Sequence, residues 1–323
     1  MKTETTVSFN TKFEEEVFEG LNSYPKFLSS KYFYDKIGDK LFQDIMNLPE
    51  YYLTDCEFEI FSDHTKAIAE IFSSSEGFDL IELGAGDGKK TKILLKYLAE
   101  NDYNFNFLPI DISQNVLDQL ESSLKKELPK VNVQTQQGTY FEVLERLSEY
   151  NKRRKVIMVL GSNIGNLLHP QAILFLKNLQ MGMSENDILF MGFDQKKNPQ
   201  TIIDAYNDKS GVTEAFNKNI LTRINREMNA DFNPDLFLHW ETYDPETGTA
   251  KSFLVSKEAH TVNIEKIDLE VSFKKWETIH TEISQKYDDQ TVEWLADESG
   301  LEVTHQFTDQ KNYYKNYIFT KSS

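Results

Sequence analysis

The clearest indication of the fold of this chain is the stretch Phe78-Asp79-Leu80-Ile81-Glu82-Leu83-Gly84-Ala85-Gly86-Asp87-Gly88. Its first six residues are mostly apolar and are typical of a buried strand, and a helical pattern over 90–100 follows the glycines. Glycines at the end of a strand allow a tight turn and a close approach to a ligand, while the helix that follows offers free backbone N–H groups. We therefore predict a strand, a turn and a helix that together bind a nucleotide-like ligand.

The spacing of the glycines narrows the choice of ligand. Lys89 stands where the fingerprint of a dinucleotide-binding turn would have its third glycine, which disfavours a pyrophosphate and favours S-adenosylmethionine. Asp111 ends the next predicted strand, where an acidic side chain can accept hydrogen bonds from both ribose hydroxyls. The glycine turn and Asp111 together predict a cofactor site.

The residues around this turn alternate between strand and helix patterns. Apart from 78–83, strands are predicted at 107–111, 131–134, 155–160 and 187–193. A helix is predicted to begin after Ser113 and to end at Pro129. The runs 155–160 and 187–193 are apolar throughout, as expected of strands buried on both faces of a parallel sheet. This alternation predicts a doubly wound α/β domain with a mostly parallel sheet.

The flanking residues follow another pattern. From 195 to 279 a polar, aromatic-rich helical stretch is followed by alternating segments with a turn at 244–248. The tail returns to a helix at 290–298 and to two runs, 301–306 and 314–320, which we predict as edge strands of the main sheet. We expect an inserted α+β domain, joined by the helical amino terminus. The predicted domains are 57–194 with 286–323, and 1–56 with 195–285.

Composition and charge limit the partners and the compartment. Thirty-five Lys and Arg against 52 Asp and Glu give a net charge of −17, which opposes binding to nucleic acids and to anionic membranes. We find no Cys/His cluster with zinc spacing, no apolar run of spanning length and no signal-peptide core in 1–10. The single cysteine, Cys56, excludes an internal disulfide and fits a reducing compartment. We expect a cytoplasmic monomer without a metal.

Eight separated motifs, in order along nearly the whole chain, resemble one family. They are YFYD at 32–35, LPEYY at 48–52, LIELGAGDGKKT at 80–91, GSNIGN at 161–166, GFD at 192–194, AYND at 205–208, FN at 216–217 and TEIS at 281–284. The chain resembles the histidine-specific methyltransferases that use S-adenosylmethionine. The resemblance implies a Rossmann-like class I methyltransferase domain with an inserted substrate-binding domain. It also implies methylation of the α-amino group of L-histidine up to the trimethylated betaine hercynine, a step of ergothioneine biosynthesis.

The resemblance also implies roles for individual residues. Tyr51, Asn166 and Tyr206 should hold the carboxylate and α-amine of the substrate, and their hydroxyl and amide groups suit both. Glu282 and Ser284 lie two apart, so in an extended segment they face one side and could grip an imidazole ring together. The predicted contacts of the cofactor are Glu82, Gly84, Gly86, Lys90, Asp111 and Gly161.

Two aromatic residues complete the predicted pocket. Tyr34 and Phe42 could receive the methylated ammonium through cation–π attraction, although Phe42 also lies on an apolar helical stripe typical of a core. Tyr34 and Asn166 are the predicted catalytic residues. None of the six histidines lies in a substrate motif, so we expect no dedicated general base; a positioned amine that loses its proton to water suffices.

Two departures from the family pattern bear on the pockets, and three other functions stay open. Thr139 stands where an aspartate would meet the adenine amino group, and Ser252 stands where a methionine would wall the substrate ring. The acceptor could be another amino acid or an aromatic amine such as a tryptophan derivative, although the Glu282 carboxylate is a poor wall for an indole. A nicotinamide-dependent oxidoreductase shares the α/β topology. A non-catalytic protein that binds S-adenosylmethionine or an amino acid is the third alternative.

Overall fold

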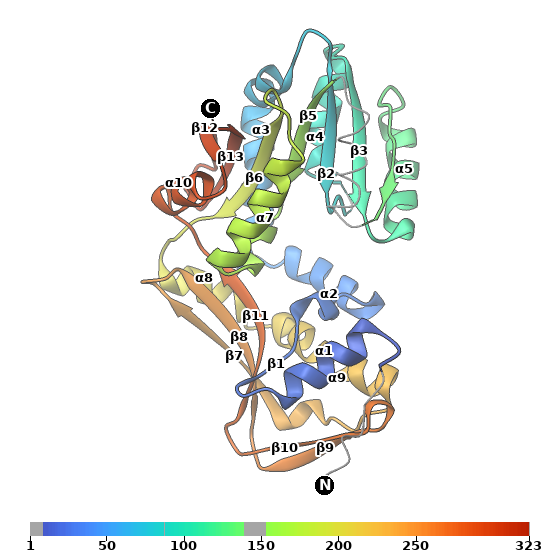
Figure 1. Cartoon of the computed structure of the whole chain (residues 1–323), viewed down its shortest axis with the longest axis vertical. Coiled ribbons are helices and arrows are strands. Elements are labelled where there is room, and N and C mark those ends of the chain that lie inside the picture. The colour runs from blue at the N-terminus through green and yellow to red at the C-terminus, as the bar shows by residue number, and fades with distance from the viewer. Residues whose placement is uncertain (1–8, 87, 139–152, 323) are drawn as a thin grey trace. The chain divides into compact units, whose positions relative to one another are not determined.

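The computed structural model describes residues 9–86, 88–138 and 153–322, and the chain divides into two compact units (Figure 1). Unit 1 comprises Met1–Tyr52 and Lys197–Ser284, and unit 2 comprises Leu53–Lys196 and Gln285–Ser323. The domain boundaries predicted from the sequence, at 56/57, 194/195 and 285/286, differ from this division by four, two and one residues. Each unit is therefore built from two separate stretches of the chain.

Unit 2 is built on a twisted, mostly parallel sheet. Within the described residues its seven strands have the order β12-β13-β6-β5-β2-β3-β4. Neighbours from β6 to β4 are parallel, whereas β13 is antiparallel to both β6 and β12. The strands are β2 (Phe78–Leu83), β3 (Phe105–Asp111), β4 (Gln136–Gln137), β5 (Arg154–Val159), β6 (Ile188–Asp194), β12 (Leu301–Thr308) and β13 (Tyr314–Lys321). The mixed α/β architecture predicted from the alternating pattern is confirmed.

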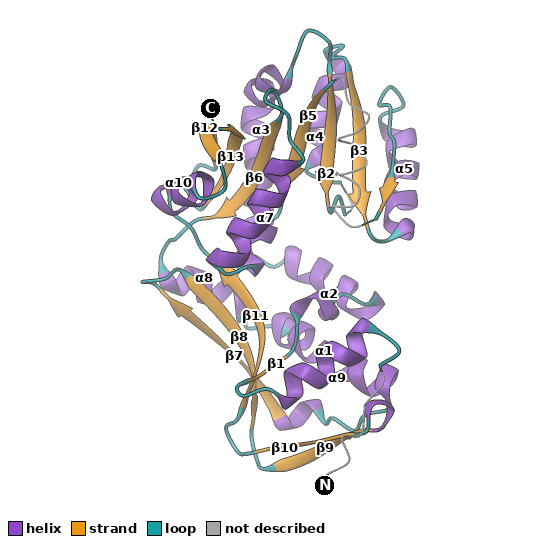
Figure 2. Ribbon diagram, in the orientation of Figure 1, coloured by secondary structure: helices purple, strands orange, loops and turns teal. Residues whose placement is uncertain are grey.

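Helices cover both faces of this sheet, as Figure 2 shows. Alternate residues of β2 enter different cores: Leu80 packs with α3, α4 and α5, and Ile81 packs with α7 and α10. The strands β5 and β6 are buried along almost their whole length, as expected for central parallel strands. The helices are α3 (Leu53–Phe72), α4 (Thr91–Glu100), α5 (Gln114–Glu127), α7 (His169–Met181) and α10 (Asp289–Asp297).

The strand predicted at 131–134 is wrong. Val133 makes only an isolated bridge to Phe107, and the ladder on this side of β3 resumes at Gln136–Gln137, opposite Ile110 and Asp111. The N–H of Phe107 donates to the carbonyl of Asn132, and the carbonyl of Phe107 accepts from the N–H of Gln134. The backbone nitrogen two residues after Phe107 therefore faces the same neighbouring segment. That residue is Pro109, which has no N–H to donate. The proline therefore interrupts the ladder between the two points of contact.

The prediction that both tail strands are edge strands is half wrong. Strand β12 is an edge of the sheet, but β13 lies between β12 and β6. Residues Asn316, Tyr317, Ile318 and Phe319 are all at most 1% exposed, so β13 is covered on both faces. The alternating pattern of 314–320 led to the prediction of an edge strand, whereas burial of its residues on both faces shows that β13 is an interior strand.

Unit 1 combines helices with a smaller sheet. Four strands of the described part of this unit have the order β1-β11-β8-β7, and β9 and β10 form a separate antiparallel pair. The predicted turn at 244–248 joins β7 to β8, with the N–H of Gly248 donating to the carbonyl of Asp244 at 2.8 Å. The strands are β1 (Lys26–Phe27), β7 (Phe237–Asp244), β8 (Thr249–Ser256), β9 (His260–Ile264), β10 (Leu269–Phe273) and β11 (Thr278–Gln285).

The helices of unit 1 and its sheet share one apolar core, to which Phe33, Phe216, Ile220, Leu254 and Ile279 contribute. The N-cap of α2 is Asp35, whose Oδ1 accepts from the N–H groups of Ile37 and Gly38. The helices are α1 (Lys12–Asn22), α2 (Lys36–Met46), α8 (Pro199–Tyr206) and α9 (Val212–Met228). Ile279 ties this core to β11, the strand that carries Glu282 and Ser284.

Candidate active site

The glycine turn after β2 has the backbone that the sequence predicts. Gly84 and Gly86 have φ angles of 74° and 53°, in the left-handed region that favours glycine. The N–H of Gly84 donates to the carbonyl of Ile110 at 2.9 Å, which ties the turn to the end of β3. An added Cβ at Gly86 would meet nothing within 4 Å. Glycine is therefore required there by the backbone angle, and the space beside it is open to a ligand.

The two predicted acidic cofactor residues stand at the carboxyl ends of neighbouring strands. Glu82 is buried on β2, and its Oε1 accepts from the Thr91 hydroxyl at 2.7 Å, which joins the strand to the start of α4. Asp111 ends β3, and its Oδ1 accepts from the N–H of Ser113 at 2.9 Å. Burial raises the pKa of Asp111, while backbone N–H groups, including that of Gly86, oppose the rise. The Asp111 carboxylate therefore lies beside the glycine turn, as predicted.

Lys90 and Gly161 are brought together by a residue that the sequence reasoning missed. The Lys90 ammonium pairs with the Glu57 carboxylate, and the N–H of Gly161 donates to Glu57 Oε2 at 2.9 Å. An added Cβ at Gly161 would lie 3.9 Å from Lys90 Nζ. Glu57 lies on α3, far from both partners in the sequence, so no local pattern marks it.

Asn166 is the one predicted substrate residue in unit 2. It is exposed at the end of a 3₁₀ helix, Asn163–Asn166, which follows β5. Ser162 has a φ of 56°, and its hydroxyl accepts from the N–H of Asp194 at 3.0 Å. The Tyr287 hydroxyl donates to the carbonyl of Ile164 at 3.2 Å. These bonds fix the loop and leave the Asn166 amide at its surface.

The remaining substrate residues lie together in unit 1. Glu282 and Ser284 are both on β11, as the extended pattern predicts, and both are partly buried. The hydroxyls of Ser284 and Tyr206 lie 2.8 Å apart in a hydrogen bond. Tyr206 ends α8, so a helix terminus and a strand meet at this bond. The acidic and hydroxyl groups predicted to grip a ring are therefore held on one rigid strand.

A chain of aromatic rings connects the other predicted residues. Ring centroids are 5.5 Å apart for Tyr34 and Phe42, and 6.3 Å apart both for Phe42 with Tyr51 and for Tyr51 with Tyr206. Phe216 of α9 contacts Tyr34 at 5.4 Å and Phe42 at 5.8 Å. Phe42 also packs against the core of unit 1, so it is a wall of the aromatic cluster and a core residue at once. Phe216 lies in a motif noted above, but no role had been assigned to it.

The pKa of the Tyr34 hydroxyl is shifted by its surroundings. Desolvation of the hydroxyl raises its pKa well above the usual value, and the Glu282 carboxylate is the next largest cause, followed by Tyr51 and Tyr206. The residue as a whole is 42% exposed, so it is the hydroxyl end that lies against the protein. Tyr34 therefore stays protonated at neutral pH, and its hydroxyl can donate a hydrogen bond.

A buried polar network fixes the strand that carries Glu282. The Thr281 hydroxyl donates to Asn217 Oδ1 at 2.8 Å and lies 3.0 Å from the carbonyl of Ser252. Asn217 belongs to α9. The Asp208 carboxylate anchors the first turn of this helix, because it accepts from the N–H groups of Thr213 at 2.8 Å and Val212 at 3.1 Å. Strand β11 is thus held from the helix side and from β8.

One of the two departures from the family pattern can be placed. Ser252 is buried, and its hydroxyl donates to Glu241 Oε2 at 2.6 Å across the β7–β8 ladder. A polar pair therefore occupies the place where a methionine was expected. Thr139 lies outside the described residues.

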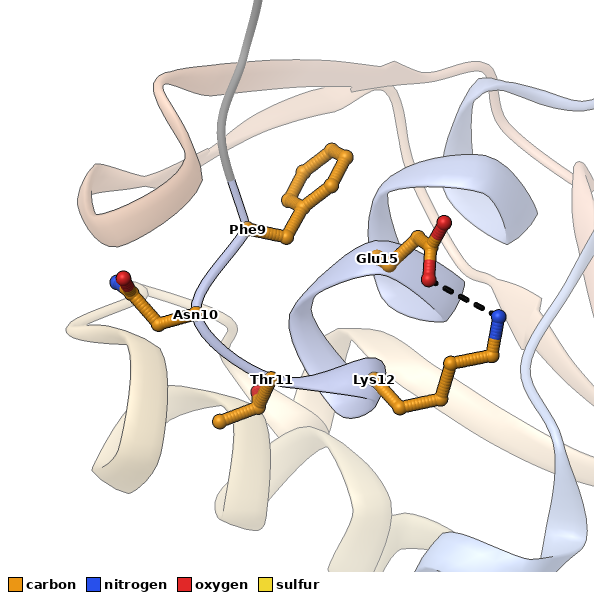
Figure 3. Close-up of a pocket in the computed structure, with 5 residues that line it drawn as sticks. All are labelled: Phe9, Asn10, Thr11, Lys12 and Glu15. Carbon is orange, nitrogen blue, oxygen red and sulfur yellow. Dashed lines mark hydrogen bonds and ion pairs between the residues drawn. The ribbon is translucent and has the colours of Figure 1, made fainter.

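No predicted site residue lines the hollow in Figure 3. It lies at the start of α1 and is lined by Phe9, Asn10, Thr11, Lys12 and Glu15, the last two joined by an ion pair of 2.9 Å.

In the described part of the chain, no group of three or more His, Cys, Asp and Glu could hold a metal ion. Across 9–86, 88–138 and 153–322, no helix is both long and apolar enough to cross a membrane.

Unit 2 has the strand order, the glycine turn after β2 and the acidic residue at the end of β3 that are expected of an S-adenosylmethionine-dependent methyltransferase. The family of histidine-specific, S-adenosylmethionine-dependent methyltransferases matches residues 13–321, and this chain belongs to that family.

Three relatives illustrate the range of the similarity. The chain is 34% identical over 294 residues to the histidine N-alpha-methyltransferase of Mycolicibacterium smegmatis, across 91% of this chain and 90% of the relative. It is also 34% identical over 295 residues to the histidine N-alpha-methyltransferase of Mycobacterium tuberculosis, with the same two coverages. The L-tryptophan methyltransferase of Psilocybe serbica is 26% identical over 325 residues, across 92% of this chain and 90% of that protein.

Proposed function

We propose that this chain transfers methyl groups from S-adenosylmethionine to the α-amino group of L-histidine, up to the trimethylated betaine hercynine. The observation that carries the proposal is the pair Glu282 and Ser284, held side by side on β11 with Tyr206 and Tyr34 against them. A carboxylate beside a hydroxyl matches the two nitrogens of an imidazole. Two relatives that are 34% identical over nine-tenths of the chain, both histidine N-alpha-methyltransferases, support the same substrate.

Unit 2 is proposed to hold the cofactor. Glu82, Gly84 and Gly86 line the turn, and Asp111 would accept from the ribose hydroxyls. Lys90 and Gly161, held together by Glu57, offer a cation and open backbone beside it. Bound there, S-adenosylmethionine supplies an electrophilic methyl group on its sulfonium sulfur. The protein's part is to hold this group and the acceptor amine in line, since positioning carries much of the rate.

Unit 1 is proposed to hold the side chain of the substrate. Glu282 would accept from one imidazole N–H, and the Ser284 hydroxyl, fixed by Tyr206, would bond the other ring nitrogen. The resemblance assigns the carboxylate and α-amine to Tyr51, Tyr206 and Asn166. In this arrangement the side chain of histidine is recognised by β11, and its amine is left free to meet the methyl group.

Proton removal in this proposal needs no dedicated base. The raised pKa of Tyr34 keeps its hydroxyl protonated, so Tyr34 orients the substrate as a donor. Burial lowers the pKa of His280, and its Nε2 lies 3.1 Å from the backbone carbonyl of Glu282. The α-amine would lose its proton to water before each transfer and attack as the neutral form.

The proposal is tested by incubating the purified protein with S-adenosylmethionine and each of the twenty amino acids in turn. Mass spectrometry would follow gains of one, two and three methyl groups on each acceptor. We expect triple methylation of histidine alone. Methylation of tryptophan, the substrate named for the Psilocybe relative, would overturn the roles of Glu282 and Ser284. Absence of methylation on every amino acid would reject the proposed reaction.

A further inference from the structure

Glu57 is a fully buried carboxylate that none of the assigned roles explains. It lies on α3 in unit 2, and its side chain is 0% exposed. A buried carboxylate is costly unless it is paired and its oxygens are satisfied by hydrogen bonds. Glu57 meets that condition through four donors from three different parts of the unit.

The two carboxylate oxygens of Glu57 have different partners. Oε1 accepts from the Tyr314 hydroxyl at 3.1 Å and from the Asn316 amide at 2.9 Å, both on β13. Oε2 accepts from the Lys90 ammonium and from the N–H of Gly161 at 2.9 Å. One oxygen therefore anchors the side chain to the interior of the sheet, and the other faces two residues of the proposed cofactor site.

The space for this carboxylate is kept by a glycine. An added Cβ at Gly192 on β6 would lie 2.5 Å from Glu57 Oε1 and 2.2 Å from the Tyr314 hydroxyl. These distances are too short for any side chain, so the first residue of the GFD motif at 192–194 makes room for the anchor. Gly192 therefore acts on the proposed cofactor site through Glu57, which bonds Lys90 and Gly161.

Lys90 keeps donors for a ligand while it is held. An ammonium carries three N–H donors, and the side chain is 23% exposed although one donor goes to Glu57. An added Cβ at Gly161 would lie at ordinary contact distance, 3.9 Å from Nζ, so there is room for a small group between this backbone and the ammonium. The anionic group of S-adenosylmethionine is the carboxylate of its methionine end, and its ribose hydroxyls suit the acceptor Asp111 instead.

We propose that Glu57 is a positioning residue: it holds the Lys90 ammonium in place to receive the methionine carboxylate of the cofactor, and it fixes the Gly161 backbone beside that ammonium through the Gly161 N–H. The inference rests on the proposed use of S-adenosylmethionine. It concerns one end of that molecule only, and this restriction makes it testable apart from general damage to the fold.

The test compares two ligands on one variant. S-adenosylhomocysteine carries the amino-acid end, and 5′-methylthioadenosine lacks it but keeps the adenosine. Glu57→Gln should weaken the binding of S-adenosylhomocysteine about 10- to 100-fold, because a hydrogen bond to a charged group is lost or misdirected. Binding of 5′-methylthioadenosine should change less than about threefold. Isothermal titration calorimetry measures both, and kinetics should show a matching rise in the KM for S-adenosylmethionine.

The glutamine variant has a route to a native fold. Asn316 Oδ1 is buried and has no hydrogen-bond partner among the described residues. Rotation of the Asn316 amide would turn that oxygen toward Glu57, where it could accept from the new NH₂ group. The matched control is Glu59→Gln, which removes an equal charge from the same helix. Glu59 accepts from the N–H of Gln310 at 3.1 Å and does not contact Lys90 or Gly161 in any described hydrogen bond.

The outcomes separate the possibilities. Equal losses for the two ligands, or no loss for either, would overturn the positioning role, as would a Glu59→Gln variant that behaves like Glu57→Gln. If the wild type binds neither ligand, the proposed cofactor and this inference fail together. Should Glu57→Gln not fold, Tyr314→Phe loosens the anchor at the other oxygen, and we expect the same selective loss, about two- to tenfold. Equal affinities in that variant would reject the proposal.

Discussion

Replacing Glu282 by glutamine should separate the recognition of the substrate from that of the cofactor. The substitution keeps the shape of a side chain that is partly buried on β11 and removes its charge. A hydrogen bond from an imidazole N–H to a carboxylate contributes about 1.5–3 kcal/mol, and partial exposure places this one near the lower end. The expected loss of affinity for L-histidine is therefore about 10- to 30-fold, with the affinity for S-adenosylhomocysteine unchanged.

The structure adds a second signature to this variant. Because the Glu282 carboxylate is the largest electrostatic cause of the raised pKa of Tyr34, that pKa should fall when the charge is removed. Isothermal titration calorimetry with each ligand measures the affinities, and ultraviolet titration of tyrosine ionisation follows the hydroxyl. Glu270→Gln, an exposed change on β10 of the same unit, is the control. Equal losses for histidine and for S-adenosylhomocysteine would refute the assignment of Glu282 to the substrate.

Three further predictions concern the frame around the sites. Asp208, whose pKa is lowered from 3.8 to about 2, should stabilise the fold above pH 4 and lose this contribution as the pH falls from about 4 to 2. Asp208→Asn should therefore lower the free energy of unfolding by about 1–2 kcal/mol at pH 7 and flatten its acid dependence in urea titrations; an unchanged pH profile would contradict this. Asp111→Asn should weaken cofactor binding about tenfold. Because burial raises the pKa of Asp111, cofactor binding by the wild type should weaken on acidification at a pH above the ordinary 3.8. If calorimetry finds wild-type affinity in the Asp111→Asn variant, Asp111 does not belong to the site. Thr281→Val leaves Asn217 Oδ1 without this donor and should cost about 1–3 kcal/mol of stability in thermal denaturation, together with a rise in the KM for histidine; a loss of stability without that rise would show that the network does not support Glu282.

The sequence predicted the parts of the fold that rest on local patterns. The glycine turn, the position of Asp111 at the end of its strand and the shared strand of Glu282 and Ser284 all follow from periodicity, turn chemistry and the family resemblance. The strand expected at 131–134 was misplaced, because the effect of Pro109 on a neighbouring strand is visible only when the two strands are paired.

Long-range contacts account for what the sequence did not reveal. Glu57 reads as one more charged residue on an amphipathic helix, and its partners Lys90, Gly161, Tyr314 and Asn316 lie 33 to 259 residues away. The interior place of β13 likewise depends on its burial between β6 and β12. A buried polar group and its hydrogen-bond partners come together only in the folded chain, so the sequence around one of them does not reveal the network.

The most direct test of the account is the position of the transferred methyl groups. The purified protein would be incubated with L-histidine and S-adenosylmethionine labelled with ¹³C in its methyl group, and the product would be examined by ¹³C NMR and by fragmentation in the mass spectrometer. If Glu282 and Ser284 hold the imidazole, every label should lie on the α-nitrogen, and the product should accumulate as the trimethylated betaine. Label on either ring nitrogen would contradict the account, because it would place the imidazole at the methyl group and leave β11 without the role proposed for it.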